Sequence, residues 1–222
     1  AVQSIADALK GTNIPVFVKN PMHADLKLWI GAIERIESAT KGDVIALHRG
    51  FSSYGLKKFR NAPMWEIPIG LRSEMPDIKL FCDPSHISGK RDLIQSIAQK
   101  AMDLGMDGLM IESHINPQVA LSDAHQQLTP KDLISLISSL EIRDLTLDKA
   151  QTLDLRDLRI ELDSIDERLV ELLSGRMNIS RAIGKYKKDN GLTVFQLSRW
   201  KEIMSSRKVW SEEMGIEQDF LR

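Results

Sequence analysis

LFCDPSHISG, residues 80–89, is a short apolar run that ends abruptly in the polar cluster Asp83–His86. An apolar run of this length is typical of a buried strand, and the polar cluster follows where that strand stops. Similar runs surround it, so that four strands are expected: IPVFVK (14–19), VIALH (44–48), IKLFC (78–82) and GLMIE (108–112). Their starts are spaced as one parallel strand plus its return helix requires. The first part of the chain therefore predicts an α/β fold with a parallel sheet.

Helical patterns fill the intervals between these strands. They cover Ala24–Ala39, the Ala62–Met75 region and Arg91–Leu104, and a further helix is expected to open at Thr129 and Pro130. Thr129 is a favourable cap, and proline is favoured at the first helical position. Gly105 supplies a stop for the third of these helices. The alternation of strand and helix supports the α/β interpretation.

Chemically active side chains follow the strands at their carboxyl ends. Lys19 closes the first strand, Arg49 follows the second, His86 follows the third and Glu112 closes the fourth. Active sites of parallel sheets collect at this edge. Strands also end wherever charge begins, so any one of these residues has an equally good structural explanation. Four consecutive strands with the same feature favour a functional site.

Cations beside histidine and carboxylates indicate a definite chemistry. Lys19 and Arg49 are suited to a phosphate or carboxylate, with arginine offering two parallel hydrogen bonds. His86, Glu112 and the later Asp123 form a nitrogen and oxygen set suited to manganese, iron or zinc. A single histidine at a strand end is more often structural than a ligand, and this spacing matches no short metal motif.

Longer motifs supply a resemblance. KNP from Lys19, HRGFSSYG from His48, CDPSH at residues 82–86 and IESHINPQVALSDAHQQLTP at residues 111–130 resemble the second half of a 3-deoxy-D-arabino-heptulosonate 7-phosphate (DAHP) synthase. That family is a (β/α)₈ barrel that condenses phosphoenolpyruvate with erythrose 4-phosphate on a divalent metal. The resemblance implies that His86, Glu112 and Asp123 are metal ligands. It also implies that Lys19 and Arg49 bind phosphoenolpyruvate.

The sequence lacks other parts of that family's pattern. The cysteine ligand of the family's first strand and its Lys-Pro-Arg motif are absent, and Cys82 lies inside a strand, where we expect it to be a core residue. The first four barrel strands would then be missing, and the outermost strands of the half barrel would be open edges. We therefore expect this chain to be a fragment of a longer protein.

The second part of the chain has a different character. We expect residues 1–141 to form the half barrel, 142–154 a polar linker and 155–222 an all-helical domain. Apolar residues then recur at steps of three and four, as in a long helix with a coiled-coil-like seam: Leu155, Leu158, Leu162, Ile165, Leu169, Leu172, Ile179, Ile183 and Tyr186. Asn190 and Gly191 should end this helix. A second helix should begin near Phe195, and SEEMGIEQDFLR (211–222) should begin a third, truncated one.

Arg176 interrupts this apolar seam. A buried, unpaired guanidinium is costly, so Arg176 is expected to meet an anion or a cavity. Lys187 lies about three turns later on nearly the same face. Arg159 flanks the same stripe near its start, and the second helix adds Arg199. These cations could also extend from the bundle to solvent, which is the simpler reading for Arg159 alone. As a set they favour a site for a small dianion.

The second part resembles the all-helical chorismate mutases. The motifs are LRIELDSIDERLVELLSGRMNISRAIGKYKK and VFQLSRW. The resemblance implies that Arg159, Arg176 and Arg199 contact the carboxylates or hydroxyl side of chorismate, with Arg159 reaching across from the partner in a homodimer. Lys187 would hydrogen-bond the ether oxygen, whose negative charge grows in the transition state.

Departures from the mutase pattern keep two functions open. Gln196 stands where an aspartate is common, and Trp200 stands where a glutamate is common. The domain is therefore expected to be either a mutase or a regulatory module that binds chorismate or prephenate and controls the synthase.

Composition bounds the remaining possibilities. A net charge of -1 gives no reason to expect nucleic acid as a partner, and no apolar stretch approaches the ~20 residues of a membrane helix. The sequence shows no signal peptide, so the expected compartment is the cytoplasm. The single cysteine excludes an internal disulfide.

Overall fold

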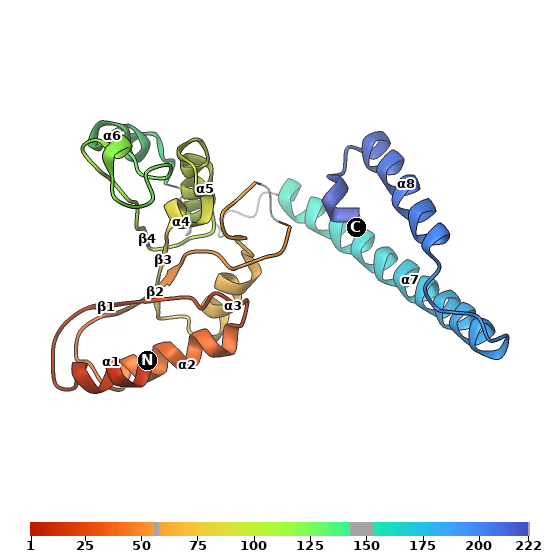
Figure 1. Ribbon diagram of the computed structural model, residues 1–222, viewed down its shortest axis with the longest axis horizontal. Coiled ribbons are helices and arrows are strands. Elements are labelled where there is room, and N and C mark those ends of the chain that lie inside the picture. Colours follow the sequence, from red (N-terminus) through yellow and green to blue (C-terminus); the bar gives the residue numbers. More distant parts are fainter. Residues whose placement is uncertain (56–57, 143–152, 222) are drawn as a thin grey trace. The chain divides into compact units, whose positions relative to one another are not determined.

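The computed structural model describes residues 1–55, 58–142 and 153–221, and the chain divides into two compact units (Figure 1). The first unit is Ala1–Leu147 and the second is Asp148–Arg222. Of the expected linker, residues 143–152 lie outside the described residues. Each unit is described by itself below.

The first unit is built on one parallel sheet. Its strands lie in chain order and are β1 (Val16–Lys19), β2 (Val44–His48), β3 (Lys79–Cys82) and β4 (Gly108–Leu109). All three pairings are parallel, with Ala46 paired to Val18 on one side and to Leu80 on the other. The predicted parallel α/β organisation is confirmed. β1 and β4 are the edge strands of this sheet.

Longer helices precede, connect and follow these strands, and those after β1 agree with the sequence pattern. They are α1 (Val2–Leu9), α2 (Leu26–Glu37), α3 (Glu66–Glu74), α5 (Arg91–Asp103) and α6 (Pro130–Ser139). The Thr129 side chain accepts a hydrogen bond from the backbone N–H of Asp132, which confirms it as the cap of α6. Gly105 has φ +69°, the left-handed conformation that stops α5 and that glycine adopts without strain.

The core lies between the sheet and its helices. Trp29, Ile33 and Leu71 are fully buried, and the indole N–H of Trp29 donates to the carbonyl of Val18 at 3.1 Å. This bond satisfies the polar end of a large buried side chain while it ties α2 to β1. Cys82 is buried in the same cluster, as expected of a small core residue.

One helix was not anticipated from the sequence, and the expected end of one strand was wrong. The cluster after β3 is a five-residue helix, α4 (Pro84–Ser88), capped by Asp83 with proline in its first turn. The fourth strand stops at Leu109 instead of Glu112. Beyond it the backbone N–H of Glu112 donates to Ser85 Oγ and its carbonyl accepts from Leu128, so the chain leaves the ladder for these partners. Glu112 therefore lies on a loop.

The second unit is helical. It consists of α7 (Leu153–Asp189), a turn at Gly191, α8 (Leu197–Met214) and the 3₁₀ helix η3 (Gln218–Leu221) (Figure 1). The expected third helix does not begin at Ser211, because Ser211–Met214 complete α8 and Gly215, at φ +67°, ends it. The seam of α7 is exposed in this chain, with Leu172 at 71% and Ile179 at 64%. No helix among the described residues has the length and apolar character needed to cross a bilayer.

His48 closes β2 in the middle of this core. Its ring is fully buried, and its centroid lies 6.4, 5.7 and 5.3 Å from the rings of Trp29, Phe51 and Trp65. Burial lowers the pKa of His48 from 6.5 to about 4, against smaller opposing effects of the Pro63 backbone and the Asp83 charge. The folded protein therefore holds this imidazole neutral.

This buried histidine predicts acid sensitivity. Between pH 6.5 and about 4 the unfolded chain binds a proton that the folded chain excludes, so the free energy of unfolding falls by up to about 3 kcal/mol as pH is lowered. His48→Phe keeps an aromatic ring but removes this titration. Denaturant unfolding across that range should show a shallower pH dependence in the variant. The same slope in both proteins would contradict the assignment to His48.

Candidate metal centre

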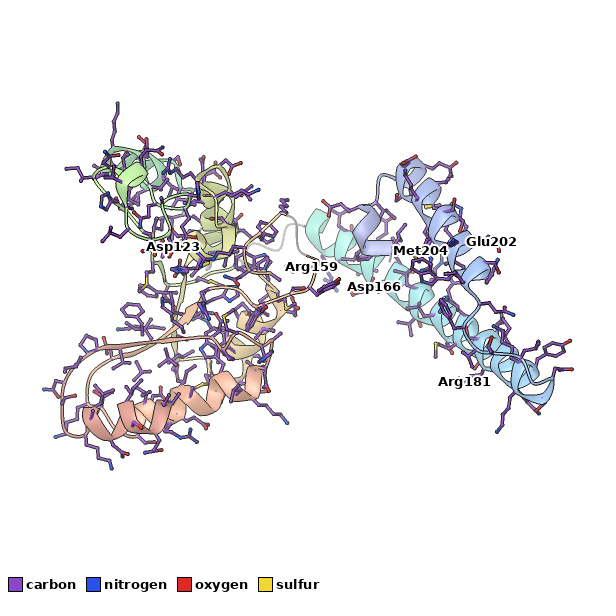
Figure 2. All side chains as sticks on the ribbon, in the orientation of Figure 1. Asp123, Arg159, Asp166, Arg181, Glu202 and Met204 are labelled. Carbon is purple, nitrogen blue, oxygen red and sulfur yellow. The ribbon has the colours of Figure 1, made fainter. Side chains whose placement is uncertain are left out.

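Three predicted ligands converge at the carboxyl edge of the sheet. His86 lies on α4, and Glu112 lies on the loop after β4. Asp123 lies on the loop that leads to α6 (Figure 2). One potential ligand atom from each side chain can be chosen so that all three atoms lie within 4.8 Å of one another. Imidazole and carboxylate donors at this separation form a set that a divalent ion can bridge.

Asp83 fixes the orientation of His86. The Asp83 carboxylate, 1% exposed, caps α4 by accepting from the backbone N–H of His86, and its second oxygen lies 2.7 Å from His86 Nδ1. This hydrogen bond raises the pKa of His86, while burial acts in the opposite direction. With Nδ1 engaged, Nε2 faces Glu112 Oε1 at 3.8 Å. A carboxylate that holds the other ring nitrogen is the common support of a metal-binding histidine.

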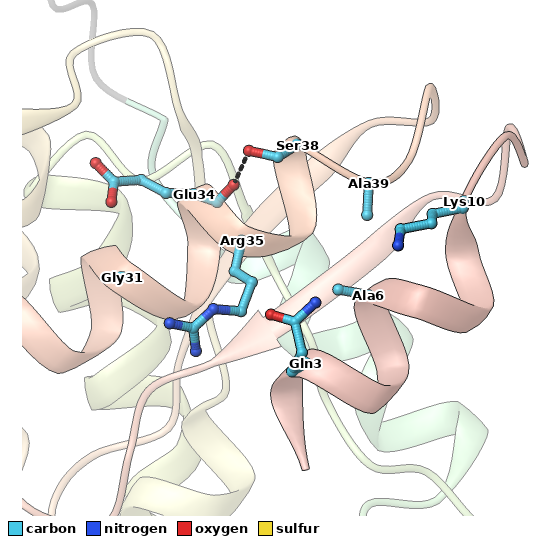
Figure 3. Close-up of a pocket in the computed structure, with 8 residues that line it drawn as sticks. All are labelled: Gln3, Ala6, Lys10, Gly31, Glu34, Arg35, Ser38 and Ala39. Carbon is cyan, nitrogen blue, oxygen red and sulfur yellow. Dashed lines mark hydrogen bonds between the residues drawn. The ribbon is translucent and has the colours of Figure 1, made fainter.

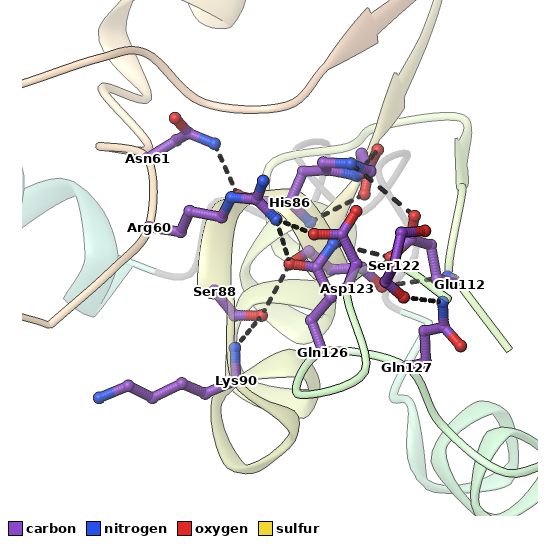
Figure 4. A network of polar contacts seen from close by, with 12 residues as sticks. Arg60, Asn61, His86, Ser88, Lys90, Glu112, Ser122, Asp123, Gln126 and Gln127 are labelled. Carbon is purple, nitrogen blue, oxygen red and sulfur yellow. Dashed lines mark hydrogen bonds and ion pairs between the residues drawn. The ribbon is translucent and has the colours of Figure 1, made fainter. Parts of the chain in front are cut away.

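Glu112 and Asp123 are held by a polar network (Figure 4). Gln126 Nε2 donates to Glu112 Oε2 at 2.7 Å. Arg60 Nη1 donates to Asp123 Oδ1 at 2.5 Å and to Gln126 Oε1 at 2.8 Å. Asp123 has φ +52°, an uncommon conformation for a residue other than glycine, which asparagine and aspartate tolerate best. Such strain at a polar cluster points to a functional constraint.

Arg91 supports the loop of Asp123 from the other side. Its guanidinium donates to the carbonyls of Ala124 and Gln127 at 2.5 and 2.7 Å. A cavity of about 230 Å³ opens beside this loop and is lined by Lys58, Phe59, Arg60, Ser88, Gly89, Lys90, Asp123, His125 and Gln126. Of the three candidate ligands, Asp123 lines this cavity.

The predicted phosphate ligands lie at the same edge. Lys19 ends β1 and is exposed, and its charge lowers the pKa of His86, in opposition to the larger effect of Asp83. Arg49 follows β2; its Nη2 contacts Met22 Sδ, and its buried Nε has no hydrogen-bond partner in the described part of the chain. Asn20 holds this turn, because its side chain accepts from the N–H of Arg49 and donates to the carbonyl of Gly50. An under-partnered guanidinium of this kind is suited to an anion.

Another groove, near the amino terminus, lies away from these residues. It has a volume of about 400 Å³ between α1 and α2 (Figure 3). Its lining residues are Gln3, Ala6, Lys10, Gly31, Glu34, Arg35, Ser38 and Ala39. None of them is a predicted site residue, and none belongs to a strand end.

The predicted residues of the second unit are not brought together by the described contacts of one chain. Lys187 Nζ donates to the carbonyl of Val194, and Arg199 pairs with Glu202 at 2.8 Å. Gln196 is the cap residue of α8, with no side-chain capping bond. Arg176 is exposed, so the expected burial in a seam does not occur within this chain. Arg159 lies near the start of α7 (Figure 2).

Three residues of the metal centre were absent from the sequence expectations. Asp83 could have been found, because an aspartate before proline signals a helix start that places its carboxylate near the residue three positions later. Arg60 and Gln126 had no local signal. They are 66 positions apart in the sequence, and their hydrogen bond becomes apparent only in the folded structure.

Comparisons with known proteins agree with this division. Residues 2–147 match the family model described as DAHP synthetase I family, and residues 158–222 match chorismate mutase type II. The chain is 28% identical over 116 residues to phospho-2-dehydro-3-deoxyheptonate aldolase of Thermotoga maritima, covering 52% of this chain and 34% of that protein. It is 33% identical over 67 residues to T-protein of Haemophilus influenzae, covering 30% of this chain and 18% of that protein.

A solved structure matches the first unit. The crystal structure of the Thermotoga maritima phospho-2-dehydro-3-deoxyheptonate aldolase (DAHP synthase) aligns with a TM-score of 0.54 and 24% identity, covering 62% of this chain and 39% of that one. At this identity the likeness concerns the fold. The chain spans about a third of the length of the first of these relatives and less of the second.

Proposed function

This chain belongs to the DAHP synthetase I family, and we propose that its first unit forms part of an enzyme that condenses phosphoenolpyruvate with erythrose 4-phosphate to give DAHP and phosphate. The observation that carries the proposal is the convergence of His86, Glu112 and Asp123 at the edge where parallel sheets place their active sites. A cytoplasmic location would fit an enzyme of small phosphorylated metabolites.

The residues of the cluster fit a divalent ion of the manganese, iron or zinc type. One neutral imidazole nitrogen and two carboxylates match the preferences of these metals, and partners already hold the other atoms of the same side chains. When bound, such an ion supplies Lewis acidity toward an aldehyde or a water. Lys19 and Arg49 would hold the phosphate and carboxylate of phosphoenolpyruvate, Arg49 chiefly the phosphate, and so place it against the aldehyde.

We propose that the second unit rearranges chorismate to prephenate as a homodimer. Arg159 precedes Lys187 by 28 residues on one continuous helix, a separation of about 42 Å. Arg159 is thus too distant to share a small ligand with Lys187 of the same chain, whereas an antiparallel partner helix would carry it there. The exposed apolar seam of α7 supplies a surface for this partner.

In that dimer the cations would stabilise developing charge. Arg159, Arg176 and Arg199 would hold the two carboxylates, Gln196 would lie beside them, and Lys187 would donate to the ether oxygen as its bond breaks. A pericyclic rearrangement needs no nucleophile or general base, so pre-organised donors are sufficient. The alternative is a regulatory module that binds chorismate or prephenate through the same cations and controls the synthase.

His86→Ala should remove the metal centre. Loss of a ligand should weaken metal binding by more than the roughly 10- to 100-fold effect of a supporting residue, and DAHP formation should fall with it. Elemental analysis after dialysis and phosphoenolpyruvate consumption measure the two effects in the intact protein. His23→Ala, at an exposed histidine, is the control. Stoichiometric metal in His86→Ala would exclude this centre.

Leu169→Glu should separate the dimer. This seam residue is 50% exposed in the single chain. A glutamate buried there in an apolar interface would have no opposite charge to pair with, which is unfavourable. Sedimentation velocity should show a dimer for the native protein and for Ser174→Glu, on the opposite face of α7, but a smaller species for Leu169→Glu. A native monomer at all concentrations would contradict the proposed assembly.

Lys187→Ala distinguishes a mutase from a sensor. A mutase should lose roughly 100-fold or more of its turnover, because the donor to the ether oxygen acts chiefly in the transition state. A sensor should have no turnover to lose and should show only a modest loss of binding. Chorismate absorbance and prephenate titration calorimetry measure the two properties. Lys188→Ala, one position away, is the matched control.

A further inference from the structure

Gln126 is a deeply buried side chain that touches the ligand cluster. It is 2% exposed, and its amide bonds side chains from two other segments, Glu112 after β4 and Arg60 before α3. Its Nε2 donates to Glu112 and its Oε1 accepts from Arg60, which also holds Asp123 (Figure 4). One neutral amide is thus placed between the two carboxylates of the cluster.

The contacts of this amide differ from those of the other buried amides. Asn20 bonds only backbone groups of Pro21, Arg49 and Gly50, and Asn61 donates to the carbonyl of His86. Those contacts hold loops in place. Both side-chain bonds of Gln126 go instead to charged side chains of the cluster, so its role concerns the orientation of those side chains.

Each ligand side chain has one atom already engaged. Asp83 holds His86 Nδ1, Gln126 holds Glu112 Oε2, and Arg60 holds Asp123 Oδ1. The opposite atoms of the first two, His86 Nε2 and Glu112 Oε1, face each other at 3.8 Å. The hydrogen bond from Gln126 to Glu112 Oε2 therefore leaves Oε1 as the oxygen of this carboxylate that faces His86.

We propose that Gln126 is a positioning residue of the metal centre, which turns Glu112 Oε1 toward the ion and links Glu112 to Asp123 through Arg60. The inference rests on the proposed function, because it requires an ion at His86, Glu112 and Asp123. An amide is suited to the task, since it donates to a carboxylate and accepts from a guanidinium with one group. An apolar residue would leave Glu112 Oε2 without its donor and Arg60 without one acceptor.

Gln126→Met tests the role without a change of charge. Methionine has a similar length and is tolerated in cores, but it forms neither hydrogen bond. A second variant, Gln126→Asn, keeps an amide on a shorter stem. Each metal-free protein, as the full chain, is titrated with Co²⁺, whose visible absorption reports both affinity and coordination geometry. His86→Ala is the reference for loss of the centre.

Both variants of Gln126 should bind Co²⁺ roughly 10- to 100-fold more weakly than the native protein, the usual effect of a residue that supports a metal ligand. The shape of the absorption band should also change, which a purely structural residue would not cause. Gln118→Met, at an exposed glutamine of η1 (Pro117–Val119), should bind as the native protein does.

The outcomes separate the two proposals. Native Co²⁺ binding by His86→Ala would overturn the metal centre itself. Loss of binding in His86→Ala together with native binding and spectra in both Gln126 variants would overturn the positioning role and leave the centre intact. Thermal melting of the metal-free proteins completes the test: failure of both variants to fold would assign Gln126 to the fold and would also overturn the proposal.

Discussion

Parallel pairing of four strands determines where the chemistry of the first unit can lie. Because β1 to β4 run in the same direction, their carboxyl ends meet along one edge. The ends of the strands and the segments that follow them carry Lys19, Arg49, His86 and Glu112. The buried side chains of the sheet, such as Ala46 and Leu80, hold that edge in place. The candidate site residues contribute little to this core. The sheet therefore provides the packing that stabilises the fold, and the segments after its strands provide the functional side chains.

The candidate metal centre contains a cation and a neutral amide beside its carboxylates. Glu112 and Asp123 bring two negative groups close together, and Arg60 places a cation next to one of them. Gln126 separates the carboxylates with a neutral group that bonds one directly and the other through Arg60. These partners offset the repulsion between the two carboxylates, because like charges in a partly buried site are unfavourable.

Regular elements were predictable from the sequence, whereas contacts across the fold were not. The strand of residues 44–48 and the stop at Gly105 follow from local patterns, and both are confirmed. The local signal of Asp83 and Pro84 was present but was not applied, so α4 was missed. No pattern could indicate Arg60 and Gln126, because their meeting depends on how distant loops pack. The exposed seam of α7 likewise shows that helix periodicity predicts which face is apolar, without showing what covers it.

The contacts that hold the candidate metal ligands differ in the sequence separation of the residues they join. His86 and its support Asp83 are three positions apart on one short helix, whereas Arg60 and Asp123 are 63 apart. Formation of a helical turn takes less than a microsecond, but a contact of long sequence separation must wait for collapse of the whole unit. The three candidate ligands are therefore brought together only when these distant segments have packed. Metal affinity would then mark the end of folding, so an incompletely folded chain would not take up the ion.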